Sequence, residues 1–223
     1  MKKNVVRFSA LISGLSGMVI LFGSIWPILD YTIKNQNLNQ LLVPLVEETP
    51  EEKQKVLDFT KASNWFPGME NEGFSTSKIS YYNISIPKLR INGATVAIGG
   101  EDLSSSLIQY PGTALPGKNG NSAIFGHSIL PIFYDPKNYI SIFSTLPTLT
   151  RGDEITINYD GVTYQYKVEE KFEVLPTDIQ VLQQDISDSF LTLVTCVPPG
   201  DPRKPKRLVI RARIVPNDLS YNN

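Results

Sequence analysis

The pattern of apolar and polar residues changes twice along the chain. Residues 8–29 form an uncharged, mostly apolar run, and since roughly 20 helical residues cross a bilayer core, this run predicts a transmembrane helix. Lys2, Lys3 and Arg7 precede the run and Asp30 follows it, which by the positive-inside rule predicts a cytoplasmic N-terminus and an extracellular remainder. A cleaved signal peptide is the alternative, but the run ends in bulky residues instead of the small ones that such cleavage needs.

The next part of the chain is more polar and richer in turn formers. Residues 31–48 contain much Asn, Gln and Leu and are interpreted as a stalk or as a continuation of the anchor helix. Thr49, Pro50 and the acids after them suit the first turn of a helix, so a short helix is predicted to about Ala62. The Pro, Gly and Ser residues of 64–77 indicate a linker.

From Ile79 onward, short runs of alternating apolar residues separated by turn formers predict strands. Asp160-Gly161 between two such runs is a strong hairpin signal. Short helices are predicted near residues 103–109 and 140–149. The pattern favours an all-β domain, a closed β-barrel of about seven or eight strands. The predicted strands are residues 82–86, 95–98, 122–126, 154–159, 162–175, 190–196 and 207–215.

These patterns divide the chain into four parts. Residues 1–33 are the cytoplasmic N-terminus and transmembrane anchor, and residues 34–78 are the stalk, short helix and linker. Residues 79–217 form the β-barrel domain, and residues 218–223 are a C-terminal tail.

The composition says little about the fold, but it excludes several kinds of partner and site. The chain has 21 basic and 22 acidic residues, and no basic block indicates a nucleic-acid surface, so that class of partner is excluded. One Cys and one His cannot form an internal disulfide or a Cys/His zinc site. They are compatible with a nucleophile and its acid/base partner.

Three short stretches bring the candidate residues to strand ends. His127 follows an apolar strand that ends at Gly126, and Cys196 ends a β-branched strand before Pro-Pro-Gly. Arg207 begins the last strand, so Cys196 and Arg207 are predicted at the same end of two adjacent antiparallel strands. Each also has an ordinary structural interpretation, as a core thiol, a solvated turn histidine and an edge charge.

Together these residues are suited to acyl transfer. A nearby imidazolium or guanidinium favours the thiolate of Cys196, which attacks a carbonyl to form a thioester. His127 then gives a proton to the leaving amine and takes one from the incoming amine. Arg207 stabilises charge on the tetrahedral intermediate or holds the substrate backbone. No Asp or Asn is clearly positioned by the sequence to orient His127, so no third member of a catalytic triad is predicted.

The three stretches together resemble the sortase family. They read Thr192-Leu193-Val194-Thr195-Cys196, Arg207-Leu208-Val209-Ile210 and Gly126-His127-Ser128. Residues 86–89 are similar to the opening strand of that family, and residues 143–155 to the stretch after its histidine. The resemblance covers roughly residues 80 to 215.

The resemblance implies an eight-stranded β-barrel with short helices and a cysteine transpeptidase activity. Such enzymes cleave an LPXTG-like C-terminal sorting signal of surface proteins between Thr and Gly, then join the acyl group to an amine of a cell-wall precursor or a pilin. By motif match, Cys196 is the nucleophile, His127 the acid/base, Arg207 the substrate or oxyanion contact and Thr195 a substrate-binding residue. The expected location is the cell membrane, with the catalytic domain extracellular.

The sequence does not decide the sortase subclass, and it gives only weak signals for a cofactor. No cofactor or metal is expected, although some sortases bind calcium and the adjacent acids Glu101 and Asp102 are weak candidates for it. Trp65-Phe66-Pro67 is a candidate for occluding the site. The alternative functions are an L,D-transpeptidase-like cell-wall enzyme and an inactive surface binding module.

Overall fold

The computed structural model describes residues 13–23, 25–26, 29–30, 33, 58, 60–66 and 80–216. The chain divides into two compact units, Met1–Val46 and Glu47–Asn223. In the first unit residues 13–23 are helical, and no helix among the described residues combines the length and apolar character needed to cross a bilayer. The predicted transmembrane helix, most of the predicted helix from Thr49 and most of the predicted linker extend outside the described residues, so these and the four-part division stay predictions.

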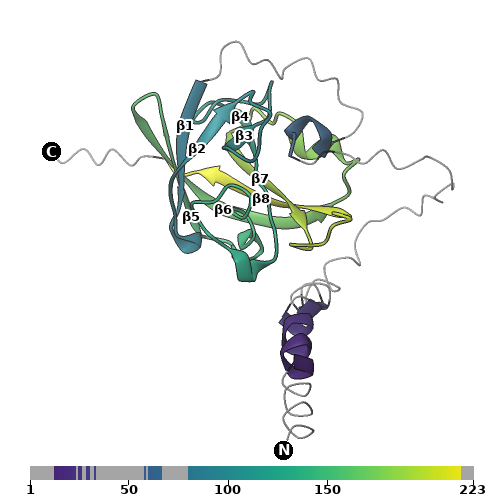
Figure 1. Ribbon diagram of the computed structural model, residues 1–223. Coiled ribbons are helices and arrows are strands. Elements are labelled where there is room, and N and C mark those ends of the chain that lie inside the picture. The colour runs from purple at the N-terminus through teal and green to yellow at the C-terminus, as the bar shows by residue number, and fades with distance from the viewer. Residues whose placement is uncertain are drawn as a thin grey trace, which may run out of the picture. The chain divides into compact units, whose positions relative to one another are not determined.

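Within residues 80–216, eight strands close into a barrel (Figure 1), which confirms the predicted all-β barrel. Around the barrel the strands follow the order β1-β2-β3-β4-β7-β8-β6-β5. Their bounds are β1 Ser80–Ile86, β2 Ile91–Ile98, β3 Leu107–Gln109, β4 Gly120–Phe125, β5 Glu154–Tyr159, β6 Val162–Val174, β7 Ser189–Val197 and β8 Lys206–Ile214. Single turns of 3₁₀ helix are η2 Ala62–Trp65, η3 Pro87–Leu89, η4 Pro131–Phe133, η5 Leu146–Thr148 and η6 Ile179–Leu182.

Local turn chemistry explains one connection, while two parallel pairings join distant segments. Asp160 and Gly161 have φ of 51° and 74°, as a two-residue type I′ hairpin requires, and β5 pairs with β6 as predicted. β2 pairs in parallel with β3, and β4 with β7. The second parallel pair brings the strand before His127 alongside the strand that carries Cys196.

Of the two short helices predicted within the barrel domain, the first is wrong and the second is reduced to one 3₁₀ turn. Residues 103–109 contain the strand β3, whose three residues are all buried between β2 and β4; a fully buried short strand carries no alternating pattern. Residues 140–149 form successive turns and only one turn of 3₁₀ helix, η5, with Pro147 near its start. Asn64 and Trp65, predicted as linker, belong to η2.

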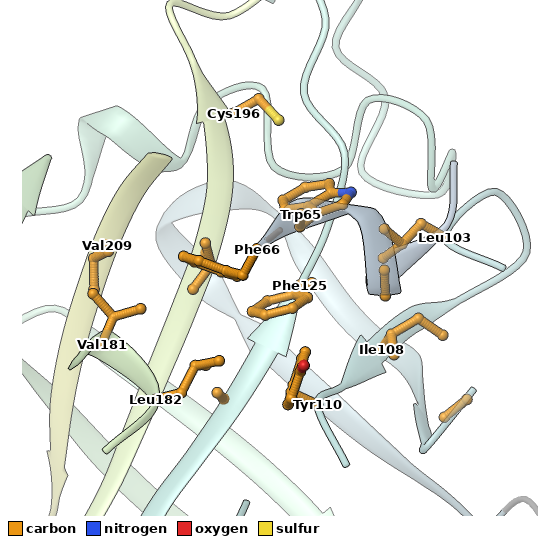
Figure 2. Close-up of a cluster of buried hydrophobic side chains, with 14 residues drawn as sticks. Trp65, Phe66, Leu103, Ile108, Tyr110, Phe125, Val181, Leu182, Cys196 and Val209 are labelled. Atoms are coloured by element: carbon orange, nitrogen blue, oxygen red, sulfur yellow. The ribbon is translucent and has the colours of Figure 1, made fainter. Parts of the chain in front are cut away.

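Side chains on both faces of β7 are buried. Successive strand residues point to opposite faces, so Leu191, Leu193 and Thr195 share one face and Val194 and Cys196 the other. The second face lies under a further apolar layer, part of which Figure 2 shows. We call this set the outer cluster: Ala62, Trp65, Phe66, Ala97, Leu103, Ile108, Tyr110, Ala123, Phe125, Val181, Leu182, Val194, Cys196 and Val209.

Candidate active site

Three adjacent strands bring the candidate residues into one row. Cys196 on β7 is the direct cross-strand partner of Arg207 on β8, which confirms their predicted adjacency. On the other side of β7, the parallel register pairs Phe125 with Val194. Continuing it by two residues brings His127 beside Cys196. The row His127–Cys196–Arg207 therefore runs from the residues just after β4, across β7, to the start of β8.

The backbone around His127 is fixed by close packing. A Cβ atom at Gly126 would lie 2.5 Å from side-chain atoms of Leu107 and Phe143, so the strand end before the histidine tolerates only glycine in this arrangement. The Phe143 N–H donates to the His127 carbonyl at 2.9 Å. The Ser128 hydroxyl donates to the Cys196 carbonyl at 2.6 Å. These bonds set the position of the histidine relative to the cysteine strand.

Thr195, assigned to substrate binding by the resemblance, has a fully buried side chain. Its hydroxyl donates to the Gly126 carbonyl at 2.8 Å. In this structure it ties β7 to β4 next to His127, and contact with substrate stays a prediction.

Arg207 is almost fully buried, with 1% of its surface exposed. Its Nη1 donates to the carbonyls of Lys204 and Lys206 at 3.0 and 3.3 Å, and its Nη2 donates to the Trp65 carbonyl at 3.2 Å. The guanidinium carbon lies 5.5 Å from the centroid of the Trp65 ring. The guanidinium thus joins the end of the β7–β8 loop and the start of β8 to the Trp65 backbone.

The segment 60–66 covers the row, as Figure 2 shows for Trp65 above Phe125 and near Cys196. The Trp65 ring stacks on Phe125 with centroids 5.5 Å apart and lies 5.9 Å from the His127 ring. Trp65 and Phe66 are 0% and 1% exposed. Of the aromatics that are candidates for occlusion, Trp65 lies against His127 and Arg207, and Phe66 packs on Phe125 in the outer cluster.

Backbone and side-chain bonds attach this cover segment to the β2–β3 connection. The Ala62 N–H donates to the Glu101 carbonyl at 3.1 Å, and the Leu103 N–H donates to the Thr60 carbonyl at 3.0 Å. The Ser63 hydroxyl donates to the Glu101 carboxylate at 2.6 Å. These pairings leave no local sequence signal, because the partners are distant along the chain.

Burial favours the neutral forms of both His127 and Cys196 in this arrangement. It lowers the pKa of His127 from 6.5 to about 4; the Lys204 cation adds to this, and Asp102 and Asp58 oppose it. Burial also raises the pKa of the Cys196 thiol, against the lowering effects of Arg207 and Lys204. The His127 Nε2 is buried and has no hydrogen-bond partner among the described residues. A thiol and a neutral imidazole are therefore the expected forms near pH 7 while segment 60–66 is in place.

The acids considered for calcium have protein partners. Glu101 accepts from Ser63 at 2.6 Å, and Asp102 accepts from the Ser104 N–H at 2.9 Å and its hydroxyl at 2.6 Å. The described part of the chain contains no group of three or more His, Cys, Asp and Glu side chains suited to a metal ion.

Comparison with known proteins decides the family. A model of the sortase domain matches residues 84–215, more than half of the chain. The chain belongs to the sortase family. Sortase A of Streptococcus agalactiae serotype III (strain NEM316) is 23% identical over 208 residues, which cover 89% of this sortase and 79% of that protein.

Solved structures agree with this assignment. A sortase D5 transpeptidase of Clostridium perfringens is 28% identical with a TM-score of 0.51, covering 60% of this chain and 78% of that one. A lid mutant of sortase A from Corynebacterium diphtheriae is 30% identical with a TM-score of 0.53, covering 64% and 76%. This sortase is accordingly a cysteine transpeptidase, and Cys196 is its only cysteine. Neither alternative function is favoured.

Removing the Trp65 ring is expected to activate the enzyme. Trp65→Ala should raise kcat/KM for a sorting peptide by about tenfold or more, because burying a large aromatic side chain contributes roughly 2–3 kcal/mol to closure. Tyr81→Ala, which removes an exposed aromatic, is the matched control and should leave kcat/KM unchanged. Equal or lower activity of Trp65→Ala with an intact fold would show that segment 60–66 does not restrict access.

The same variant should change the titration of the single histidine. With the indole removed, water reaches His127, so its pKa should rise from about 4 towards 6.5. Proton NMR of the imidazole follows this directly, because the chain has one His. An unchanged pKa in Trp65→Ala would mean that burial by other groups dominates.

Proposed function

We propose that this sortase cleaves an LPXTG-like C-terminal sorting signal of surface proteins and transfers the acyl group, through a thioester on Cys196, to an amine of a cell-wall precursor or a pilin. One observation carries the proposal: Cys196 and Arg207 are cross-strand partners on β7 and β8, and His127 follows β4, the other neighbour of β7, at the end of an apolar outer face.

Each residue of the row has a chemical task in this reaction. The Cys196 thiol gives its proton to His127, and the resulting thiolate attacks the carbonyl carbon of the scissile amide. The imidazolium returns that proton to the leaving amine as the C–N bond breaks, leaving the thioester. An incoming amine then attacks the thioester, loses a proton to His127, and the thiol is restored. Arg207 donates to the carbonyl oxygen as negative charge develops on it.

The contacts of Arg207 support its substrate role. Its Nη2 already donates to a backbone carbonyl, that of Trp65, so the same donor is able to bind a peptide carbonyl once segment 60–66 moves away. The outer cluster around Val194, Phe125 and Val209 then offers an apolar surface for the hydrophobic residues of the sorting signal. Substrate and cover segment would compete for one surface.

An amine should outcompete water at the acyl-enzyme. Adding oligoglycine or a similar amine to enzyme and sorting peptide is expected to divert product from the free acid to the amide, as quantified by mass spectrometry. An arm with EDTA should give the same yield, since the three side chains supply every step without a metal or cofactor. Exclusive hydrolysis across a broad panel of amines would make the protein a peptidase.

On this proposal the protein is held in the cell membrane by residues 8–29, with its N-terminus cytoplasmic and its barrel outside. The large apolar side chains described at Leu15, Met18, Val19, Ile20, Leu21 and Phe22 are each more than 60% exposed, which supports burial in lipid. Full-length protein should stay in the membrane fraction, and external protease on spheroplasts should degrade the part after about Ile33. Recovery of a soluble secreted form cleaved near Leu29 would refute the anchor.

A further inference from the structure

One wall of the outer face is formed by the β6–β7 connection. This connection contains η6, Ile179–Leu182. Val181 and Leu182 are 4% and 7% exposed and belong to the outer cluster together with Cys196. Figure 2 labels both near Val209 and below Phe66. A peptide replacing Trp65 and Phe66 on this face would meet these two side chains.

Two side chains from different strands share the carbonyl of Val181. Asn121 of β4 donates through Nδ2 at 2.9 Å, and Arg211 of β8 donates through Nη2 at 3.2 Å. Asn121 is 1% exposed, and its Oδ1 accepts from the Thr192 hydroxyl at 2.7 Å. That third bond fixes which end of the amide points at Val181, so the donor is oriented before any peptide arrives.

The shared carbonyl lies at some distance from the reacting atoms. Arg211 is the cross-strand partner of Thr192, as Arg207 is of Cys196. The two arginines are four residues apart on one strand face, about 13 Å along the strand. Arg211 forms no ion pair with a carboxylate among the described residues, and its Nε is buried without a hydrogen-bond partner there. These side chains therefore act on the peptide-binding face and not on the row His127–Cys196–Arg207.

We propose that Asn121 and Arg211 are positioning residues that hold the η6 wall in place for the apolar residues of the sorting signal upstream of the cleaved bond. The inference rests on the proposed function, because it requires a peptide on the outer face. A carbonyl oxygen accepts two hydrogen bonds, and here each lone pair has its own donor. We expect one of the two hydrogen bonds to be enough to keep η6 in position, and η6 to become mobile only when both are lost.

The rest of the β6–β7 connection stays attached when both donors are removed. Gln184 donates to the carbonyls of Asn121 and Leu182 at 3.1 and 2.9 Å, and its Oε1 accepts from the Asn121 and Ala114 N–H groups. Substitutions at residues 121 and 211 keep these backbone contacts. The expected effect is a looser wall in a folded protein.

Kinetics of four variants test the proposal. Asn121→Ala and Arg211→Met should each raise the KM for a sorting peptide by about twofold, whereas the double variant should raise it by about 30-fold, since two net hydrogen bonds are then lost. The kcat should change by less than about twofold. Arg211→Lys in the Asn121→Ala background restores one charged donor, so its KM should be close to that of the wild type and far below that of the double variant.

Two matched variants serve as controls. Arg213→Met removes an arginine that pairs with Glu169 and Asp188, and Asn119→Ala removes a donor to the carbonyl of Ile186, whose side chain is exposed. Neither should change KM. A double variant with KM within about twofold of wild type, or with reduced kcat at unchanged KM, would overturn the proposal.

Hydrogen exchange separates this inference from the proposed function. In the double variant the amides of residues 179–184 should exchange faster, while those of β7 keep their protection. This readout does not need turnover, so it decides the role of the two donors even if no sorting peptide is cleaved. Unchanged exchange across residues 179–184 would refute the proposal that Asn121 and Arg211 hold this segment. Should Asn121→Ala not fold, Thr192→Val combined with Arg211→Met frees the Asn121 amide instead and carries the same expectation.

Discussion

Cys196→Ala should abolish cleavage of sorting peptides, with a loss of about 10⁵-fold or more, the scale expected when a covalent nucleophile is removed. The fold should survive, because the change removes one sulfur atom from a strand-end side chain in the outer cluster and costs on the order of 1 kcal/mol. Peptide turnover followed by chromatography gives the activity, and a thermal melt by circular dichroism gives the stability. Turnover like that of the wild type would rule out thioester chemistry at this residue.

His127→Ala should be nearly as damaging as loss of the cysteine. In the proposed mechanism both proton transfers use this imidazole, and His127 is the only histidine of the chain. The two single variants and the double variant should therefore have similar residual rates, since residues that act as a unit are not additive.

Arg207→Lys is expected to lower kcat/KM by about tenfold to thousandfold, by analogy with loss of one oxyanion donor. The substitution keeps the positive charge but removes the planar guanidinium, whose two terminal nitrogens donate in different directions. Arg207 donates to the Lys204 and Lys206 carbonyls through Nη1, while its Nη2 donates to the Trp65 carbonyl. An ammonium cannot serve both directions in that fixed geometry.

Arg203→Ala is the matched control for this prediction. Arg203 lies in the same loop, its side chain is 81% exposed, and it pairs with Asp201 at 2.7 Å. An exposed pair of this kind contributes little to stability, so its loss should change kcat/KM by less than about threefold. If Arg203→Ala were inactive and Arg207→Ala were near normal, the motif match at this site would be wrong.

The contact between Cys196 and Arg207 was predictable because it is local. The two residues end and begin consecutive antiparallel strands, so a hairpin register brings them together. The position of His127 next to Cys196 was not predictable from periodicity, because it depends on the parallel pairing of β4 with β7. A crossover of that kind leaves no short-range signal, and only the motif resemblance linked the two residues.

The missed features share a physical reason. β3 is three buried residues long, and a run this short has no pattern that distinguishes a strand from a helix. Trp65 was recognised as an aromatic near the site, but its contacts with Arg207 and Phe125 come from segments far away in sequence. The Asn121 and Arg211 contacts with Val181 likewise join three separate elements.

The central claim is that Cys196 forms a thioester with a sorting peptide. Intact-protein mass spectrometry of the enzyme mixed with a small panel of sorting peptides tests it most directly, using the wild type, Trp65→Ala and Cys196→Ala. The wild type and Trp65→Ala should gain the mass of the peptide portion before the cleaved bond, with the adduct on Cys196, and Cys196→Ala should gain none. An adduct that persists in Cys196→Ala, or its absence from wild type and Trp65→Ala with every peptide, would contradict the account.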